Sequence, residues 1–165
     1  MIVSNSSPII LLAKQGMLDL MKKCFKKAVI PKSVYEEVSQ KKGSPELIAL
    51  EKAIKDKWVV VEKVNVIPAL DTKNLGQGEK EAISLAVKHK SMLILDDDAA
   101  KKYSAIFGIE AHGVLYVIYL ALIRKFIDDT DAMNALEGMI VDGFYISHDV
   151  YMRFFELLNS EKKKI

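Results

Sequence analysis

The chain has little cysteine and no long hydrophobic run, and both features narrow the kinds of protein that it can be. Cys24 is the only cysteine, so no disulfide can form within one chain, which fits a reducing cytosol. The most apolar run, Val114 to Ile123, is too short to span a bilayer and is typical of a buried helix. The first residues lack a basic segment and a cleavage site and read as a strand. We therefore expect a cytoplasmic protein without a membrane segment.

Several kinds of catalytic site are also missing. His89, His112 and His148 lack the spacing of metal ligands, so a zinc site is not indicated, and no Ser-His-Asp or Cys-His arrangement can be traced. Gly76-Gln77-Gly78 has neither a third glycine nor a strand directly before it, so it predicts a turn and not a dinucleotide-binding loop. Any chemistry must therefore come from other side chains.

Net charge is only +2, but the lysines are unevenly spread. Taken singly, each lysine cluster is best explained as a solvated surface, and the alternative is attraction of phosphate around an acidic centre. The clusters are Lys22-Lys23 with Lys26-Lys27, Lys41-Lys42, and Lys162-Lys163-Lys164.

Half of the residues are hydrophobic, which predicts a folded protein with a buried core. We expect one domain over residues 1–159, followed by a lysine-rich tail at 160–165. Strands are predicted at 2–4, 28–30, 58–61, 92–95 and 108–111. Helices are predicted from Pro8 with Ser6 or Ser7 as its cap, from 18, from Ser33, and over 45–54, 79–89, 99–107, 114–125, 130–141 and 148–159. Residues 63–76 are expected to form a loop.

This alternation predicts an α/β fold, with a parallel sheet of four to five short strands covered by helices on both faces. Ligands of such sheets bind outside the carboxyl ends of the strands. Asn5, Asp96 and Asp97 follow predicted strands and are expected at that edge.

Four glutamates are the next candidates. Ser33 and Glu36 have the spacing of a capping box, so Glu36 has a structural explanation and Glu37 is freer for chemistry. Glu79 falls on the apolar face of its predicted helix and would need a partner there, while Glu81 lies at the edge of that face. The alternative is that Glu79 and Glu81 are only acids of a helix start, stabilised by its dipole.

The run Asp96-Asp97-Asp98 directly follows an apolar strand. One of the three is expected to cap the next helix, which leaves one or two to face the strand ends. Adjacent carboxylates repel one another, which raises their pKa values unless a cation is present. If these acids converge with Glu37 and with Glu79 or Glu81, their oxygens suit Mg²⁺ or Mn²⁺ and not zinc.

At these residues the chain resembles the PIN-domain family of metal-dependent ribonucleases, and within it the DUF3368 branch. The resemblance extends from residue 2 to about residue 155. It rests on the stretches Val3-Ser4-Asn5-Ser6-Ser7-Pro8, Ile30-Pro31-x-Ser33-Val34-Tyr35-x-Glu37-Val38, Leu75-Gly76-x-Gly78-Glu79-x-Glu81-Ala82-Ile83-x-Leu85-Ala86 and Leu93-Ile94-Leu95-Asp96-Asp97-x-Ala99-Ala100, with Gly113 opening the next helix.

The resemblance implies a three-layer α/β/α fold and hydrolysis of RNA phosphodiester bonds with Mg²⁺ or Mn²⁺. It also implies a possible role as the toxin of a toxin–antitoxin pair, with an antitoxin protein as partner and a homodimer as a possible assembly. Carried over by position, the catalytic acids are Glu37, Glu79 or Glu81, and Asp96 or Asp97. Asn5 and Ser6 join these acids as metal-binding residues.

Asn5 departs from the family pattern, which has an aspartate at this position. Asparagine keeps one carbonyl oxygen for a metal but lacks the charge. Two hypotheses follow: an active metal-dependent endoribonuclease, or a PIN scaffold that binds RNA or a protein partner without cleavage. A nucleotide-binding α/β domain of another kind is a third reading.

Overall fold

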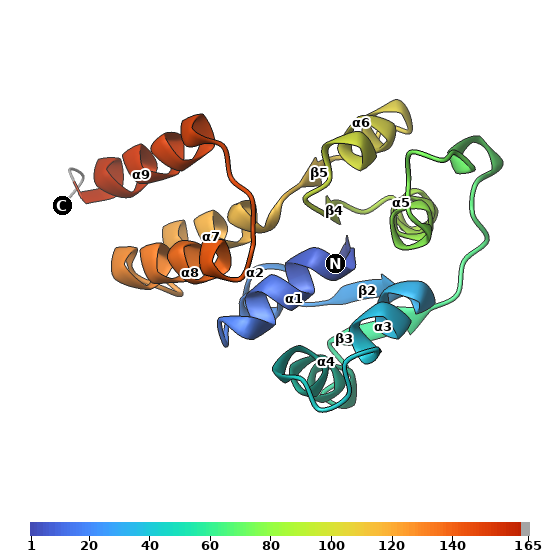
Figure 1. Ribbon diagram of the computed structural model, residues 1–165, viewed down its shortest axis with the longest axis horizontal. Coiled ribbons are helices and arrows are strands. Elements are labelled where there is room, and N and C mark those ends of the chain that lie inside the picture. The colour runs from blue at the N-terminus through green and yellow to red at the C-terminus, as the bar shows by residue number, and fades with distance from the viewer. Residues whose placement is uncertain (163–165) are drawn as a thin grey trace.

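The computed structural model describes residues 1–162, with side chains described through residue 159 (Figure 1). All five strands of its sheet are parallel, and their order is β3-β2-β1-β4-β5. The strands are β1 (Ile2–Ser4), β2 (Ala28–Pro31), β3 (Val59–Glu62), β4 (Leu93–Ile94) and β5 (Ala111–His112). The predicted parallel α/β fold is therefore confirmed.

Helices connect the strands and cover both faces of the sheet, which gives three layers. They are α1 (Ser6–Lys14), α2 (Asp19–Phe25), α3 (Lys32–Ser39), α4 (Pro45–Lys55), the short 3₁₀ helix η1 (Pro68–Leu70), α5 (Gln77–His89), α6 (Asp98–Ile106), α7 (Val114–Ile123), α8 (Asp129–Val141) and α9 (His148–Lys162). The 3₁₀ turn η1 lies within the segment 63–76 that the sequence predicts to be a loop.

Alternate residues of each strand supply two separate cores, because successive side chains point to opposite faces of a sheet. Ile2 and Ile30 belong to the larger core, which includes apolar residues of α1–α4 and α7–α9. Val3 and Val29 belong to the smaller core, where the buried residues of α5 pack with Ala100 of α6. The central strands β1, β2 and β4 are thus buried on both faces, which explains their mostly apolar sequences, whereas the outer strands β3 and β5 are largely half-buried.

Two predicted helix caps are wrong. The first helix begins at Ser6 with Asn5 as its N-cap, so neither Ser6 nor Ser7 is the cap and Pro8 is its third residue. The helix expected from Ser33 begins at Lys32 directly after β2, with Pro31 as the N-cap. Glu36 makes no capping box with Ser33 and instead forms an exposed ion pair with Lys32 at 2.7 Å. Both helices start earlier because the chain enters them from the strand without a turn.

The last helix includes residues 160–162 of the predicted lysine-rich tail, and residues 163–165 lie outside the described part of the chain. Among the described residues, no helix combines the length and the apolar character needed to cross a membrane.

Candidate functional site

The strand order changes direction between β1 and β4, and the candidate site lies at the carboxyl edge beside this point. Asn5 follows β1, and its backbone N–H donates to the Ile94 carbonyl of β4 at 3.0 Å. Only 6% of Asn5 is exposed, and its side chain makes no capping hydrogen bond to α1. Its Oδ1 atom is fully buried and has no hydrogen-bond partner among the described residues. Such an atom costs about 1–3 kcal/mol, which a bound cation or water would offset.

Glu37 of α3 and the backbone of α5 complete this part of the site. A Cβ atom added to Gly78 would lie 3.2 Å from Asn5 Oδ1 and 3.6 Å from Glu37 Oε2. The two oxygens therefore face the same point on the α5 backbone, which comes close because residue 78 has no side chain. No hydrogen bond of the Glu37 carboxylate is found among the described residues, so it is available to a ligand.

These groups line a cavity of about 490 Å³ that we call the Asn5 cavity. Its lining comes from the starts of α1 and α5 and from the length of α3, and it carries mostly polar side chains. The lining residues are Asn5, Ser6 and Ser7 of α1 and its cap, Ser33, Glu36, Glu37 and Gln40 around α3, and Gly76, Gln77, Gly78 and Glu79 of α5.

Glu79 lines the Asn5 cavity but is held by its own helix. Its Oε2 accepts a hydrogen bond from the Gly76 backbone N–H at 2.7 Å, as the carboxylate of a capping box does. The sheet-facing position inferred from the helical stripe is therefore wrong, and the helix-start explanation holds for Glu79.

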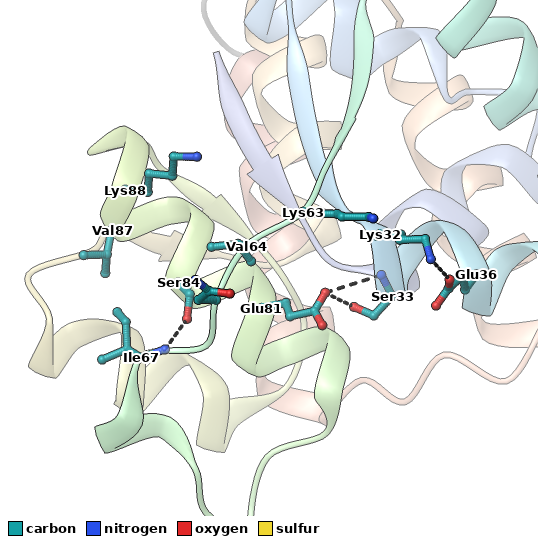
Figure 2. A pocket seen from close by; sticks show the side chains of 11 residues that line it. Lys32, Ser33, Glu36, Lys63, Val64, Ile67, Glu81, Ser84, Val87 and Lys88 are labelled. Atoms are coloured by element: carbon teal, nitrogen blue, oxygen red, sulfur yellow. Dashed lines mark hydrogen bonds and ion pairs between the residues drawn. The ribbon is translucent and has the colours of Figure 1, made fainter.

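Glu81 has partners on two helices. It accepts from the Ser33 hydroxyl at 2.6 Å and from Gln77 Nε2 at 2.7 Å, and it lines a neighbouring groove instead of the Asn5 cavity (Figure 2). Sequence reasoning missed Ser33 because it lies 48 residues from this acid. It missed Gln77 because residues 76–78 were predicted to be a turn, whereas Gln77 is the first residue of α5 and lies one helical turn before Glu81. The position of Ser33, two residues after the end of β2, was the available signal.

The three aspartates after β4 have different surroundings. Asp97 is the N-cap of α6 and accepts from the Ala100 backbone N–H at 2.7 Å, so the predicted cap is confirmed. Asp98 is exposed and lies 3.6 Å from the Lys101 amine. Asp96 turns inward, where its Oδ1 accepts from the Val114 backbone N–H at 2.9 Å at the start of α7.

Burial raises the pKa of Asp96, and the charge of Asp98 adds to this, while the Val114 hydrogen bond and Lys101 act in the opposite direction. Desolvation is the largest cause, and the predicted repulsion between adjacent carboxylates adds to it through Asp98. The Asp96 Oδ2 atom is fully buried without a hydrogen-bond partner among the described residues. Gly113 makes this position possible, since a Cβ atom there would lie 2.5 Å from Asp96 Oδ1.

The predicted site residues are thus distributed around one edge and are not gathered in one cluster. Asn5, Ser6, Glu37 and Glu79 share a cavity, Glu81 lines the adjacent groove, and Asp96 lines a third cavity with residues of α7 and the segment before α9. Within the described residues, no group of three or more histidine, cysteine, aspartate and glutamate side chains is close enough to hold a metal.

The chemistry of the donors nevertheless fits a hard divalent cation. Among the described residues, three buried side-chain oxygens have no hydrogen-bond partner. Asn5 Oδ1 and Asp96 Oδ2 follow the adjacent strands β1 and β4, and the third, Glu46 Oε2, lies on α4. With the free carboxylate of Glu37, Asn5 and Asp96 offer only oxygen ligands, which suit Mg²⁺ or Mn²⁺ completed by water.

Comparison with protein families gives a match over nearly the whole chain. The profile of DUF3368, described as a PIN domain, matches residues 1–160. The chain belongs to the PIN-domain family. Members of this family generally are nucleases that depend on divalent metal ions.

A solved structure supports the fold of this PIN domain. The chain is similar to a PilT N-terminus domain protein from the hyperthermophilic archaeon Sulfolobus solfataricus P2, with a TM-score of 0.50 and 20% identity. The similarity covers 71% of this chain and 90% of the archaeal one. A comparison with curated protein sequences gives no match.

Proposed function

We propose that this PIN domain is a divalent-metal-dependent endoribonuclease that hydrolyses RNA phosphodiester bonds at the Asn5 cavity. The observation that carries the proposal is the buried Asn5 Oδ1 atom, which has no partner among the described residues and faces the same point as the Glu37 carboxylate. Both groups would be ligands of Mg²⁺ or Mn²⁺, and Asp96 would approach from the neighbouring strand.

A bound divalent ion would supply a Lewis acid for the phosphate and would lower the pKa of a coordinated water, so that this water could lose a proton near neutral pH. The protein contributes position and charge. Glu37 presents a carboxylate that could accept a hydrogen bond from an attacking water, and Ser6 adds a polar group at the cavity wall. Glu79 and Glu81 keep the start of α5 in place through Gly76 and Ser33, so we assign them positioning roles.

The test is cleavage of a labelled RNA with Mn²⁺ or with EDTA, using wild type and Glu37→Gln. Glu37→Gln keeps the size of the side chain and removes one anion, and we expect its cleavage rate to fall about tenfold or more. Glu137→Gln is the matched control, because Glu137 is exposed on α8 and does not line these cavities. Equal cleavage by wild type and Glu37→Gln, or equal cleavage in Mn²⁺ and EDTA, contradicts the proposal.

A second function, RNA binding without cleavage, is favoured by one observation: the first position of the acid set is the neutral Asn5. Under this alternative, wild type binds RNA in a salt-dependent way without turnover. Asn5→Asp then creates cleavage where wild type has none, whereas the active-enzyme proposal requires turnover by wild type.

The proposal extends to a cytoplasmic toxin that an antitoxin protein neutralises, and to a homodimer. These assignments rest on the family resemblance. Growth arrest on expression of wild type but not of Glu37→Gln would support the toxin role, and light scattering of the purified protein would measure the assembly.

A further inference from the structure

Two lysines extend the carboxyl edge of the sheet beyond the acidic site. Pro31 of β2 pairs with Glu62 of β3, and each is the last residue of its strand. Lys32 and Lys63 follow directly, so they are neighbours across the end of the sheet. Because the strand order is β3-β2-β1-β4-β5, this edge carries cations over β3 and β2 beside the Asn5 cavity over β1.

A groove of about 770 Å³ joins these lysines to the candidate site, and we call it the Lys63 groove (Figure 2). It runs between α3, the segment after β3 and α5. It shares Ser33 and Glu36 with the Asn5 cavity, so the two hollows are adjacent.

A second hollow continues from the lysines on the other side. Lys32 and Lys63 also line a cavity of about 440 Å³, which we call the Tyr35 cavity. Its other lining residues are Tyr35, Glu51, Ile54 and Val61. Tyr35, Ile54 and Val61 are half-buried and pack against the larger core, so they form an apolar wall that contains one aromatic ring.

The charges of this path suit an anionic chain. Among the described side chains, no ion pair involves Lys63. Lys32 forms an ion pair with the exposed Glu36, and the Glu81 carboxylate also attracts it. An exposed pair of this kind contributes at most about 1 kcal/mol, so a phosphate can replace Glu36 as the partner of Lys32. Glu81 in the same groove is already bound by Ser33 and Gln77.

We propose that a single strand of RNA leaves the Asn5 cavity through the Lys63 groove, places its phosphates on Lys32 and Lys63, and stacks a base on Tyr35 in the Tyr35 cavity. A basic groove beside an aromatic ring is the usual arrangement for single strands, because each base offers a flat apolar face. The inference deepens the proposed function and rests on it for the identity of the strand.

The test measures binding of fluorescein-labelled oligouridylate by anisotropy in EDTA, over a series of salt concentrations. Lys32→Ala/Lys63→Ala removes two phosphate contacts, so the slope of log affinity against log salt should fall by about 1.4. The control Lys22→Ala/Lys102→Ala removes two exposed lysines on α2 and α6 that line none of these hollows, and it should keep the wild-type slope.

The aromatic part is tested separately. Tyr35→Leu keeps an apolar side chain but removes the ring, and stacking on one base corresponds to a loss of affinity of roughly fivefold to a hundredfold. Tyr35→Phe keeps the ring and should bind like wild type. Circular dichroism of each variant shows whether it is folded.

The outcomes separate this inference from the proposed function. Binding that depends on the two lysines and on Tyr35, without cleavage in Mn²⁺, supports the path and refutes the nuclease. Cleavage that Glu37→Gln abolishes, with binding unaffected by the lysine and Tyr35 variants, refutes the path and keeps the nuclease. Displacement of the oligouridylate by polyglutamate as readily as by unlabelled oligouridylate also overturns the path, since it indicates an acidic peptide.

Discussion

Asn5→Asp tests the central feature of the site, because it restores the missing charge at a position that is only 6% exposed. Without metal, the new carboxylate lies beside Glu37, and its N-cap position at the start of α1 offsets only part of the repulsion. Two unit charges at ~4 Å and an effective dielectric constant of ~20 interact by about 4 kcal/mol, which is an upper scale. Glu37 is exposed, so screening reduces the effect, and we expect a loss of about 1–2 kcal/mol in the free energy of unfolding.

For a protein of this size, such a loss lowers the melting temperature in EDTA by about 2–8 °C. Mn²⁺ should reverse the sign, because the added anion strengthens cation binding and a ligand that binds only the folded state stabilises it. A tenfold gain in affinity corresponds to about 1.4 kcal/mol more stabilisation at saturating metal. The assay is differential scanning fluorimetry over a Mn²⁺ titration, for wild type and variant.

Asn134→Asp is the matched control, since Asn134 is exposed on α8 and the substitution adds the same charge away from the site. Its melting temperature should follow wild type with and without Mn²⁺. If Asn5→Asp melts like wild type in EDTA and gains no more from Mn²⁺, then Asn5 does not belong to a metal site and the assignment of the Asn5 cavity is refuted.

Three further predictions concern the neighbouring strand end. Because burial raises the pKa of Asp96 in the folded protein, ionisation of this carboxyl group destabilises the fold. The stability that the protonated carboxyl group provides is fully present below the pKa of an unfolded aspartate and is lost as pH rises through the raised pKa of Asp96. In EDTA, Asp96→Asn should therefore show a higher urea midpoint than wild type at pH 7.5, with a smaller difference at pH 4.5, and a constant difference would contradict this. Gly113→Ala places a methyl group 2.5 Å from Asp96 Oδ1, and we expect urea denaturation to show a loss of about 1–3 kcal/mol, whereas unchanged stability would mean that Asp96 moves freely. Asp97→Ala should lose about 1 kcal/mol of stability, whereas Asp97→Ser should lose little because it keeps a capping oxygen. We expect both variants to cleave RNA, and equal losses of stability would refute the capping role.

The architecture was predictable because β1, β2 and β4 are short apolar runs, each followed closely by a polar helix start. Strands and helices that alternate along a chain predict a parallel sheet whose strands are connected by helices. The same local reading placed Asn5 and Glu37 near strand ends, and the fold brings them to one point through Gly78.

The roles of individual acids were less predictable, because local patterns have competing solutions. Ser33 and Glu36 fit a capping box by spacing, yet Pro31 acts as the N-cap and the Ser33 hydroxyl binds Glu81. The helical stripe placed Glu79 toward the sheet, but a first-turn carboxylate can instead reach back to a backbone N–H, here that of Gly76. Long-range partners of this kind are set by tertiary structure and leave no spacing in the sequence.

Asp96 and Asp97 show the same limit. Either could cap α6 by sequence, and the choice depends on the Val114 N–H, which lies 18 residues further along the chain. Only the packing of α7 against the end of β4 provides that donor, and only Gly113 leaves room for the carboxylate to reach it.

The neutral Asn5 connects the two proposals, because the charge at this position acts in opposite directions on metal and on RNA. An aspartate would attract a divalent ion more strongly, but in the metal-free protein it would add repulsion against phosphates entering from the Lys63 groove. Asparagine keeps an oxygen ligand and removes that repulsion, so the lysines over β2 and β3 can hold RNA before metal binds. If both proposals hold, a site of this composition favours RNA binding over metal affinity, and the metal concentration then decides whether bound RNA is held or cut.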